Sequence, residues 1–168
     1  MMPNVKALQV IEQQWLDRVV ELAEQTIRSS KVYGKQCRKN HWSLEKRCPK
    51  CGDKTSDILQ RAQLSNLQNL ANASDSVKAL ELFVLYQMGR KEGKGWQYKG
   101  SGTVSFGFKV IEDFNQLGEW AKQIASDSAE SNPKAVHLWL IRLYCGFLSR
   151  WFVALKGGEE EVETVEEE

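Results

Sequence analysis

The chain has 168 residues, of which 42% are hydrophobic and 27% charged, and its formal net charge is +1. These values suit one globular domain that is long enough to bury a hydrophobic core without disulfides or metal ions to stabilise it. No uninterrupted apolar run reaches the ~18 residues of a membrane span, and the first residues lack the apolar stretch of a signal peptide. We therefore expect a cytoplasmic protein without a membrane partner, whose thiols are kept reduced.

The charge is unevenly distributed along the chain. Residues 159–168, EEEVETVEEE, hold seven of the 22 acidic residues, so residues 1–158 carry 23 basic and 15 acidic side chains, a net +8. A block of glutamates repels itself, which predicts a disordered, solubilising acidic tail over 159–168. An alternative is that the tail competes with nucleic acid for the basic surface. Residues 1–158 are predicted to form a single helical domain.

The first half of the chain contains three predicted helices. Apolar residues at intervals of three and four predict an amphipathic helix over about residues 5–29. Thr55 or Ser56 is expected to cap a second helix that starts at Ile58. The third helix is predicted over 77–89, where VKALELFVLYQMG ends at a glycine.

The second half begins with a segment that opposes regular structure. Residues 89–109 contain six glycines and five basic residues, which predicts a Gly-rich basic loop, with a short strand possible over 103–108. A helix resumes at residue 109, and a last helix is expected over 133–156, ended by the glycine pair at 157–158. This helix is apolar nearly all round and is predicted to be central. The expected fold is an all-α, five-helix bundle with two irregular insertions.

Three cysteines and a histidine lie within fifteen residues, at the spacing Cys37-x3-His41-x6-Cys48-x2-Cys51. Cys3His is a standard ligand set for tetrahedral zinc, and four protein ligands leave no open position. The sequence therefore predicts a structural Zn²⁺ site, a Cys3His zinc-knuckle insertion over residues 33–54. Cys145, on the last helix, is expected to be a core residue.

Two other interpretations of the cysteines involve redox chemistry, and the first, a disulfide between Cys48 and Cys51, is disfavoured in a reducing compartment. A thioredoxin-type pair at Cys48 and Cys51 needs a βαβ context, which the helical pattern does not supply.

GRKEGKG at 89–95 lacks the ending of a phosphate-binding P-loop and follows a helix instead of a strand. No Ser/His/Asp or Cys/His set remains once a metal takes its ligands. The sequence therefore predicts a protein that is not an enzyme.

Both insertions combine basic and aromatic residues. The predicted zinc loop carries Arg38 and Lys39 near Tyr33 and Trp42, which suits phosphate contact and base stacking. The Gly-rich segment repeats this composition with Arg90, Lys91, Lys94 and Trp96. Two such segments on one small chain favour nucleic-acid binding.

Three short motifs resemble the small subunit of type III (Csm-type) CRISPR–Cas effector complexes. They are TSDI at 55–58, LELFVLYQMGR at 80–90, and a final aromatic helix that closes with LKGG at 155–158. The resemblance covers about residues 55–91 and 109–158, just over half of the chain. The predicted zinc loop, the Gly-rich segment and the acidic tail are departures from that family.

The resemblance implies a non-catalytic, RNA-binding bundle that stacks in several copies along guide RNA and target RNA. Its partners would be further copies of itself, the backbone subunits and the large subunit. Arg90 matches the family's Gly-Arg position. The basic residue that usually follows the isoleucine of the first motif is a leucine here, so Arg61 is the nearest candidate. Arg142 and Arg150 on the final helix are candidates too, with salt bridges or edge positions as the alternative.

A second function stays open. The chain could be an independent zinc-containing nucleic-acid-binding or adaptor protein, whose basic loops dock an acidic partner.

Overall fold

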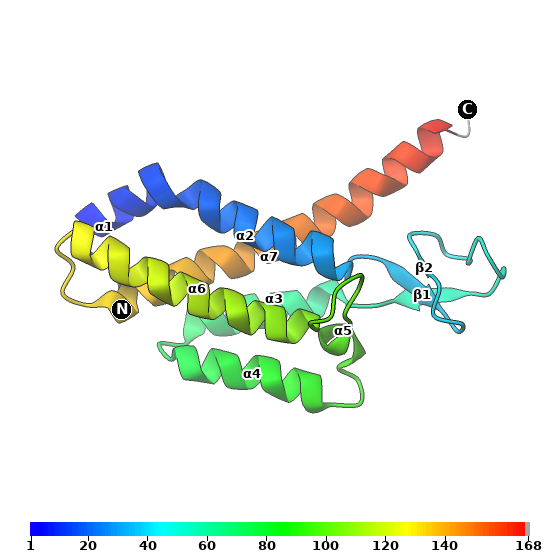
Figure 1. The fold of residues 1–168 in the computed structure, drawn as a ribbon, viewed down its shortest axis with the longest axis horizontal. Helices are drawn as coiled ribbons and strands as arrows, with labels where there is room; N and C mark the ends of the chain where they lie inside the picture. The colour runs from blue at the N-terminus through cyan, green and yellow to red at the C-terminus, as the bar shows by residue number, and fades with distance from the viewer. Residues whose placement is uncertain (167–168) are drawn as a thin grey trace.

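The structure is a computed structural model that describes residues 1–166, with side chains described for residues 1–157. It is mostly helical (Figure 1). The helices are α1 (Val5–Val10), the π-helix η1 (Ile11–Trp15), α2 (Leu16–Ser30), α3 (Arg61–Ala73), α4 (Val77–Gly89), α5 (Lys94–Gln97), α6 (Phe106–Asp127) and α7 (Pro133–Glu166). The predicted count of five is reached only when α1, η1 and α2 are taken as one continuous helix and the short α5 is left aside.

The first helix begins where its sequence provides a cap. The side chain of Asn4 accepts a hydrogen bond of 2.8 Å from the Ala7 backbone N–H, which satisfies one of the free donors of the first turn. At η1 the helix widens to π geometry, and this turn buries both Ile11 and Trp15. Figure 1 shows that the run of α1, η1 and α2 is arched, as expected where a π turn interrupts an α-helix.

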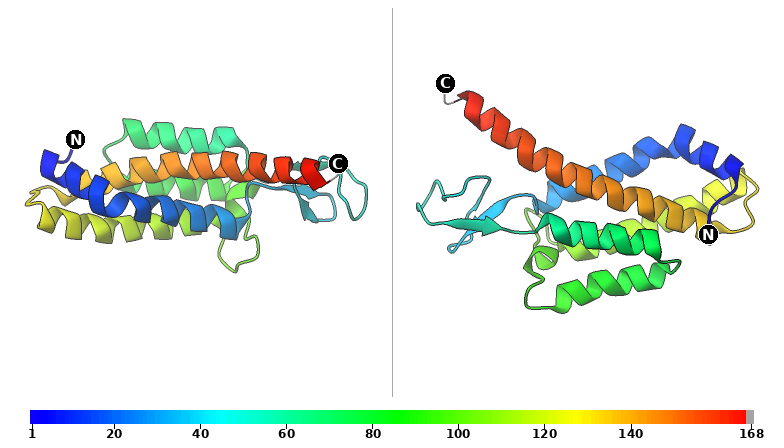
Figure 2. Two further views of the ribbon diagram at one scale, coloured as in Figure 1. Left: turned by 90° about the horizontal axis from the view of Figure 1, so that it is seen from above. Right: turned by 180° about the vertical axis from the view of Figure 1, so that it is seen from behind.

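α7 is the central helix, as its apolar composition predicts. It packs against α2, α3 and α6 (Figure 2), and Tyr144, Leu148 and Phe152 are among its buried residues. Its first 25 residues, Pro133–Gly157, are long and apolar enough to cross a membrane by length and composition. Half of the most apolar stretch is buried inside the bundle, so burial against the other helices also accounts for the composition.

The predicted end of the last helix is wrong. α7 continues through the glycine pair at 157–158 as far as Glu166, so residues 159–166 are helical where a disordered tail was predicted. Glycine lowers helix stability by only about 1 kcal/mol per residue, and glutamate is a good helix former. Glu167 and Glu168, the last two residues of that predicted tail, lie outside the described residues.

A small antiparallel sheet lies between α2 and α3, so the prediction of an all-α fold is also wrong. Its strands are β1 (Lys35–Cys37), β2 (Trp42–Ser43) and β3 (Thr55–Asp57), in the order β2-β1-β3. Thr55 and Ser56 pair with β1 instead of capping a helix. α3 starts later, at Arg61, with Gln60 as its N-cap in a capping box with Gln63.

The Gly-rich segment is packed against the bundle and contains no strand at 103–108. α6 already starts at Phe106, with Ser105 as its cap. A Cβ on Gly95 would lie 2.5 Å from the Ile58 carbonyl oxygen, so glycine is required for this close approach. The glycines here permit close packing as well as turns.

Candidate functional site

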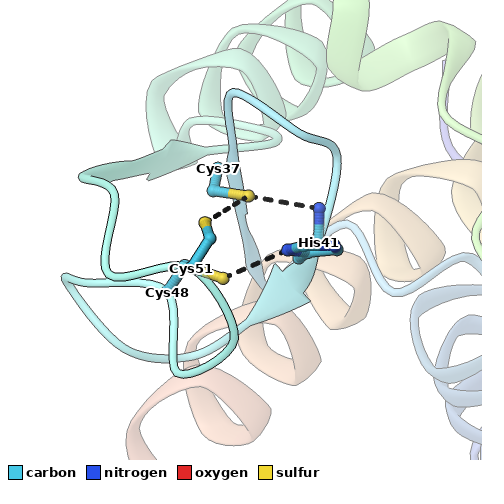
Figure 3. A group of neighbouring side chains, drawn as sticks. All are labelled: Cys37, His41, Cys48 and Cys51. Carbon is cyan, nitrogen blue, oxygen red and sulfur yellow. Dashed lines mark hydrogen bonds between the residues drawn. The ribbon is translucent and has the colours of Figure 1, made fainter.

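The first two predicted metal ligands come from one tight turn. Cys37 is the last residue of β1 and His41 directly precedes β2. The Cys37 backbone N–H donates to the His41 carbonyl at 3.1 Å, and that of Asn40 donates to the Cys37 carbonyl at 2.9 Å. Asn40 has a φ of 64°, a left-handed conformation that asparagine tolerates. This turn directs both side chains to the same side (Figure 3).

The other two ligands come from a second turn. The Gly52 N–H donates to the Cys48 carbonyl at 2.8 Å, and the Cys48 N–H donates to the Asp53 carbonyl at 2.8 Å. Gly52 has a φ of 74°, which favours glycine directly behind Cys51. The sequence CPKCG thus forms a reversal that brings its two thiols towards the first turn.

The four side chains form one cluster that could hold a metal ion. One ligand atom from each of Cys37, His41, Cys48 and Cys51 lies within 4.8 Å of the other three. The Cys37 and Cys51 sulfurs are 3.7 Å apart, and the Cys48 sulfur is 3.4 Å from His41 Nδ1. Around a tetrahedral ion with ~2.3 Å bonds to sulfur and ~2.0 Å bonds to nitrogen, these separations would be about 3.8 and 3.5 Å. These two separations therefore match those around a tetrahedral metal.

The local backbone also favours a thiolate at Cys48. Burial would raise the pKa of this thiol, but the backbone N–H groups of Lys50 and Cys51, the Cys51 thiol and His41 together lower it to about 6. At Cys51 the backbone N–H of Asp53 favours the thiolate, yet burial and the neighbouring thiols raise the pKa to about 11. Cys48 can therefore bind a metal as a thiolate near neutral pH, whereas the Cys51 thiol would lose its proton when a metal binds.

The remaining cysteine and histidine lie in the bundle. Cys145 is 1% exposed, and burial raises the pKa of its thiol, which confirms it as a core residue. The ring of His137 packs near Gly118 and places Nε2 2.7 Å from the Phe114 carbonyl oxygen.

A groove with three predicted RNA-binding residues lies where α3 begins and α4 ends. We call it the basic groove; its volume is about 610 Å³. Arg90, Lys91 and Lys94 line it together with Asp57 and Glu92. Arg90 lies over the Tyr86 ring and 3.6 Å from the Glu92 carboxylate, so its charge is partly compensated.

A second hollow of about 480 Å³ connects the basic groove with the candidate metal centre. Cys37 itself lines this hollow, together with Arg38 and Lys54. Lys94 and Asp57 line both spaces. Lys39, the other predicted contact of this loop, is exposed but lines neither.

Asp57 is a residue that sequence reasoning missed. Its carboxylate accepts from Lys35 of β1 and from Lys156 of α7, both at 2.9 Å. Burial opposes ionisation, but the two ammonium groups lower the pKa of Asp57 overall. This network of two ion pairs ties the sheet to the central helix and lies beside the basic groove. No periodicity in the sequence marks it, because its three members come from distant segments.

The three other predicted arginines lie elsewhere. Arg61 and Arg150 line a different groove, between α3 and α7. Arg142 donates to the Ala71 and Ser74 carbonyls at 2.8 and 3.0 Å and pairs with Asp75 at 3.3 Å. Its position caps the end of α3, which favours the salt-bridge interpretation for Arg142.

The aromatic side chains expected to stack on bases are largely buried. Trp96 is fully buried between Phe83 and Phe106. Tyr33 is 6% exposed and packs edge-on against Trp42, whose indole N–H donates to the Lys31 carbonyl at 2.9 Å. The prediction that Trp96 and Tyr33 form stacking platforms is therefore wrong, because both rings belong to the core.

Replacement of Trp96 tests this correction. We expect Trp96→Leu to lower the free energy of unfolding by about 2 kcal/mol, because core volume is lost. If the chain binds RNA, as the sequence predicts, we expect its affinity for RNA to stay unchanged. Urea denaturation and fluorescence anisotropy with a labelled RNA measure the two quantities. A base stacked on Trp96 would instead make the loss of affinity about 1–3 kcal/mol.

Within residues 1–157, positive charge is concentrated in the segments that form the sheet, its loops and α5, which lie near one another in Figure 1. Residues 31–61 and 89–100 hold thirteen basic and four acidic side chains, a net charge of +9, whereas the rest of residues 1–157 has a net charge of −1.

No known protein family, curated protein or solved structure matches this chain.

Proposed function

We propose that Cys37, His41, Cys48 and Cys51 bind one structural Zn²⁺ ion. The support is the ligand set together with separations that fit a tetrahedron. Because all four positions would be filled by protein atoms, the ion would hold the two turns together without activating a substrate.

We further propose that the chain is a non-catalytic RNA-binding protein. The observation that carries this proposal is the basic groove, in which Arg90, Lys91 and Lys94 converge beside a metal-stabilised loop that adds Arg38 and Lys54. Cations gathered in a groove suit the phosphate backbone of a nucleic acid. Asp57, the carboxylate shared by both spaces, is engaged by two lysines and is not a free acid or base.

In its specific form, the proposal makes the chain the small subunit of a type III CRISPR–Cas effector complex in the cytoplasm. It would bind guide RNA and target RNA beside the backbone subunits, the large subunit and further copies of itself. The support is the resemblance of three short motifs, one of which ends at Arg90 in the basic groove.

One observation favours the alternative of an adaptor protein. Leu82, Leu85 and Tyr86 of α4 are 65%, 45% and 63% exposed, and large apolar side chains gathered on a helix surface are typical of protein contacts. In an effector complex this face of α4 would meet another subunit. In an independent adaptor it would meet the partner itself.

The proposal predicts a large, salt-dependent loss of RNA affinity when the basic groove is neutralised. We expect Arg90→Ala, Lys91→Ala and Lys94→Ala together to weaken binding by tenfold or more, and to reduce the slope of log affinity against log salt by about 2, since each phosphate contact on a single strand contributes about 0.7. Anisotropy titrations across a salt series measure both.

The matched control is Lys6→Ala, Lys122→Ala and Lys134→Ala, which removes the same charge from exposed residues outside the basic groove and hollow. Equal losses in both variants would mean that only net charge matters and would remove the groove from the proposal.

Affinity purification from the native host separates the two functions. Effector subunits with short RNAs indicate the CRISPR complex, and one acidic protein without RNA indicates the adaptor.

A further inference from the structure

A second groove runs along the contact between α3 and α7, and we call it the α3–α7 groove. It consists of two adjoining cavities of about 430 and 280 Å³ that share Gln68, Gly146 and Arg150. Arg61 lines the larger cavity at the start of α3, and Arg142 lines the smaller one. Because α3 and α7 are long, packed helices, the side chains that line the groove have rigid supports.

The α3–α7 groove differs from the basic groove in its charge balance. No acidic residue lines either of its cavities, whereas Asp57 and Glu92 line the basic groove. Among the described residues, Arg61 and Arg150 have no hydrogen bond and no ion pair; the guanidinium of Arg150 lies 5.5 Å from the centre of the Phe147 ring. Two uncompensated arginines in one cavity create a positive potential that attracts an anion.

Neutral hydrogen-bond donors complete this site. Arg150 Nη1 and Gln68 Nε2 each lie 3.4 Å from the point where a Cβ on Gly146 would stand. Gly146 therefore leaves space between a charged and an amide donor. Ser149 lines the same cavity, and its hydroxyl is buried and has no hydrogen-bond partner within the described part of the chain.

We propose that the larger cavity of the α3–α7 groove binds a phosphoryl group, held by Arg61, Arg150 and Gln68. A guanidinium presents paired N–H donors that match phosphate oxygens. The same chemistry accepts a phosphate of the RNA backbone or a free phosphate compound. This site is separate from the basic groove and does not depend on the metal centre.

Isothermal titration calorimetry of the zinc-loaded full chain with inorganic pyrophosphate tests the site directly. We expect binding to the natural protein and a loss of at least about tenfold in affinity for Arg61→Ala with Arg150→Ala, because two charge-assisted contacts are removed. Lys6→Ala with Lys134→Ala is the control of equal charge and should leave the affinity unchanged. Absence of binding to the natural protein, or equal losses in both variants, would overturn the proposal.

A second measurement identifies the source of the phosphoryl group. If RNA displaces pyrophosphate and the arginine variant also weakens RNA binding, the α3–α7 groove holds the RNA backbone. If RNA neither displaces pyrophosphate nor loses affinity, the site serves a free phosphate compound. Both outcomes support the site, and neither depends on variants of the basic groove, so failure of the proposed function would be recognised separately.

Discussion

Cys48→Ser is expected to abolish stoichiometric zinc binding and to unfold the two turns of residues 33–54, while most of the helical signal persists. A Cys3His site contributes about 10–16 kcal/mol of metal-binding free energy at neutral pH, and this energy is coupled to the folding of its loop. Backbone pairing alone holds the two turns together weakly, because β2 is only two residues long and pairs with β1 at two positions. The helices instead pack through α7.

Metal analysis after dialysis, with far- and near-ultraviolet circular dichroism, measures these effects. Near-ultraviolet changes are expected because Trp42 and Tyr33 pack at the base of the loop. Cys145→Ala is the control, since Cys145 is buried in the bundle and is not a ligand; it should keep its zinc. Loss of the whole helical signal in Cys48→Ser would contradict a loop that folds separately from the bundle.

Asp113→Ala is expected to lower the free energy of unfolding by about 2–5 kcal/mol, because it leaves buried hydroxyl groups without an acceptor. Asp113 is 1% exposed in the middle of the bundle, and its carboxylate accepts hydrogen bonds from Thr26 of α2 and Tyr144 of α7. Lys109 reaches the other carboxylate oxygen at 3.4 Å. Three helices are thus joined through one side chain.

The same carboxylate makes stability dependent on pH. Burial raises the pKa of Asp113, and the hydrogen bonds from Thr26 and Tyr144 only partly oppose this. A carboxyl group with a higher pKa in the folded state binds its proton more tightly there. Its contribution to stability is therefore fully present below the unfolded pKa of about 3.9 and is lost as pH rises through the folded pKa.

Asp113→Asn removes this titration and keeps a polar group in place. We expect the stability difference between the natural protein and Asp113→Asn to shift in favour of the variant as pH rises from 4 to 8. Urea denaturation of both proteins at each pH cancels the contribution of the metal site, which is common to them. A difference that stays constant over this range would contradict the raised pKa.

The long helices were predictable from their apolar residues: a periodic apolar face indicates the first helix, and a composition that is apolar nearly all round indicates the central α7. The first helix lies where the spacing of apolar residues placed it, α4 covers the predicted residues 77–89, and α7 begins at residue 133 as predicted. The three strands escaped prediction because each has only two or three residues. They are specified by the pairing of β1 with β2 and with β3, which no local pattern reveals.

The metal cluster was predictable because its ligands lie close in sequence. The grooves were not, because they bring together residues such as Arg38 and Lys94, or Arg61 and Arg150, from distant segments. Trp96 was misassigned for a related reason. Basic and glycine neighbours suggested an irregular basic loop, whereas the missing side chains of Gly93 and Gly95 are what let this segment pack closely around a buried ring.

The sheet has a consequence for how this chain can have diversified. β3 is both the outer strand beside β1 and the segment that leads into α3, and the Ile58 N–H donates to the Gly34 carbonyl at 3.2 Å. The ligand-bearing turns are therefore part of the segment that connects α2 to α3. A relative that lost the ligands would have to rebuild that segment, so we expect the four ligands to be gained or lost together, with a change in the length of the α2–α3 connection.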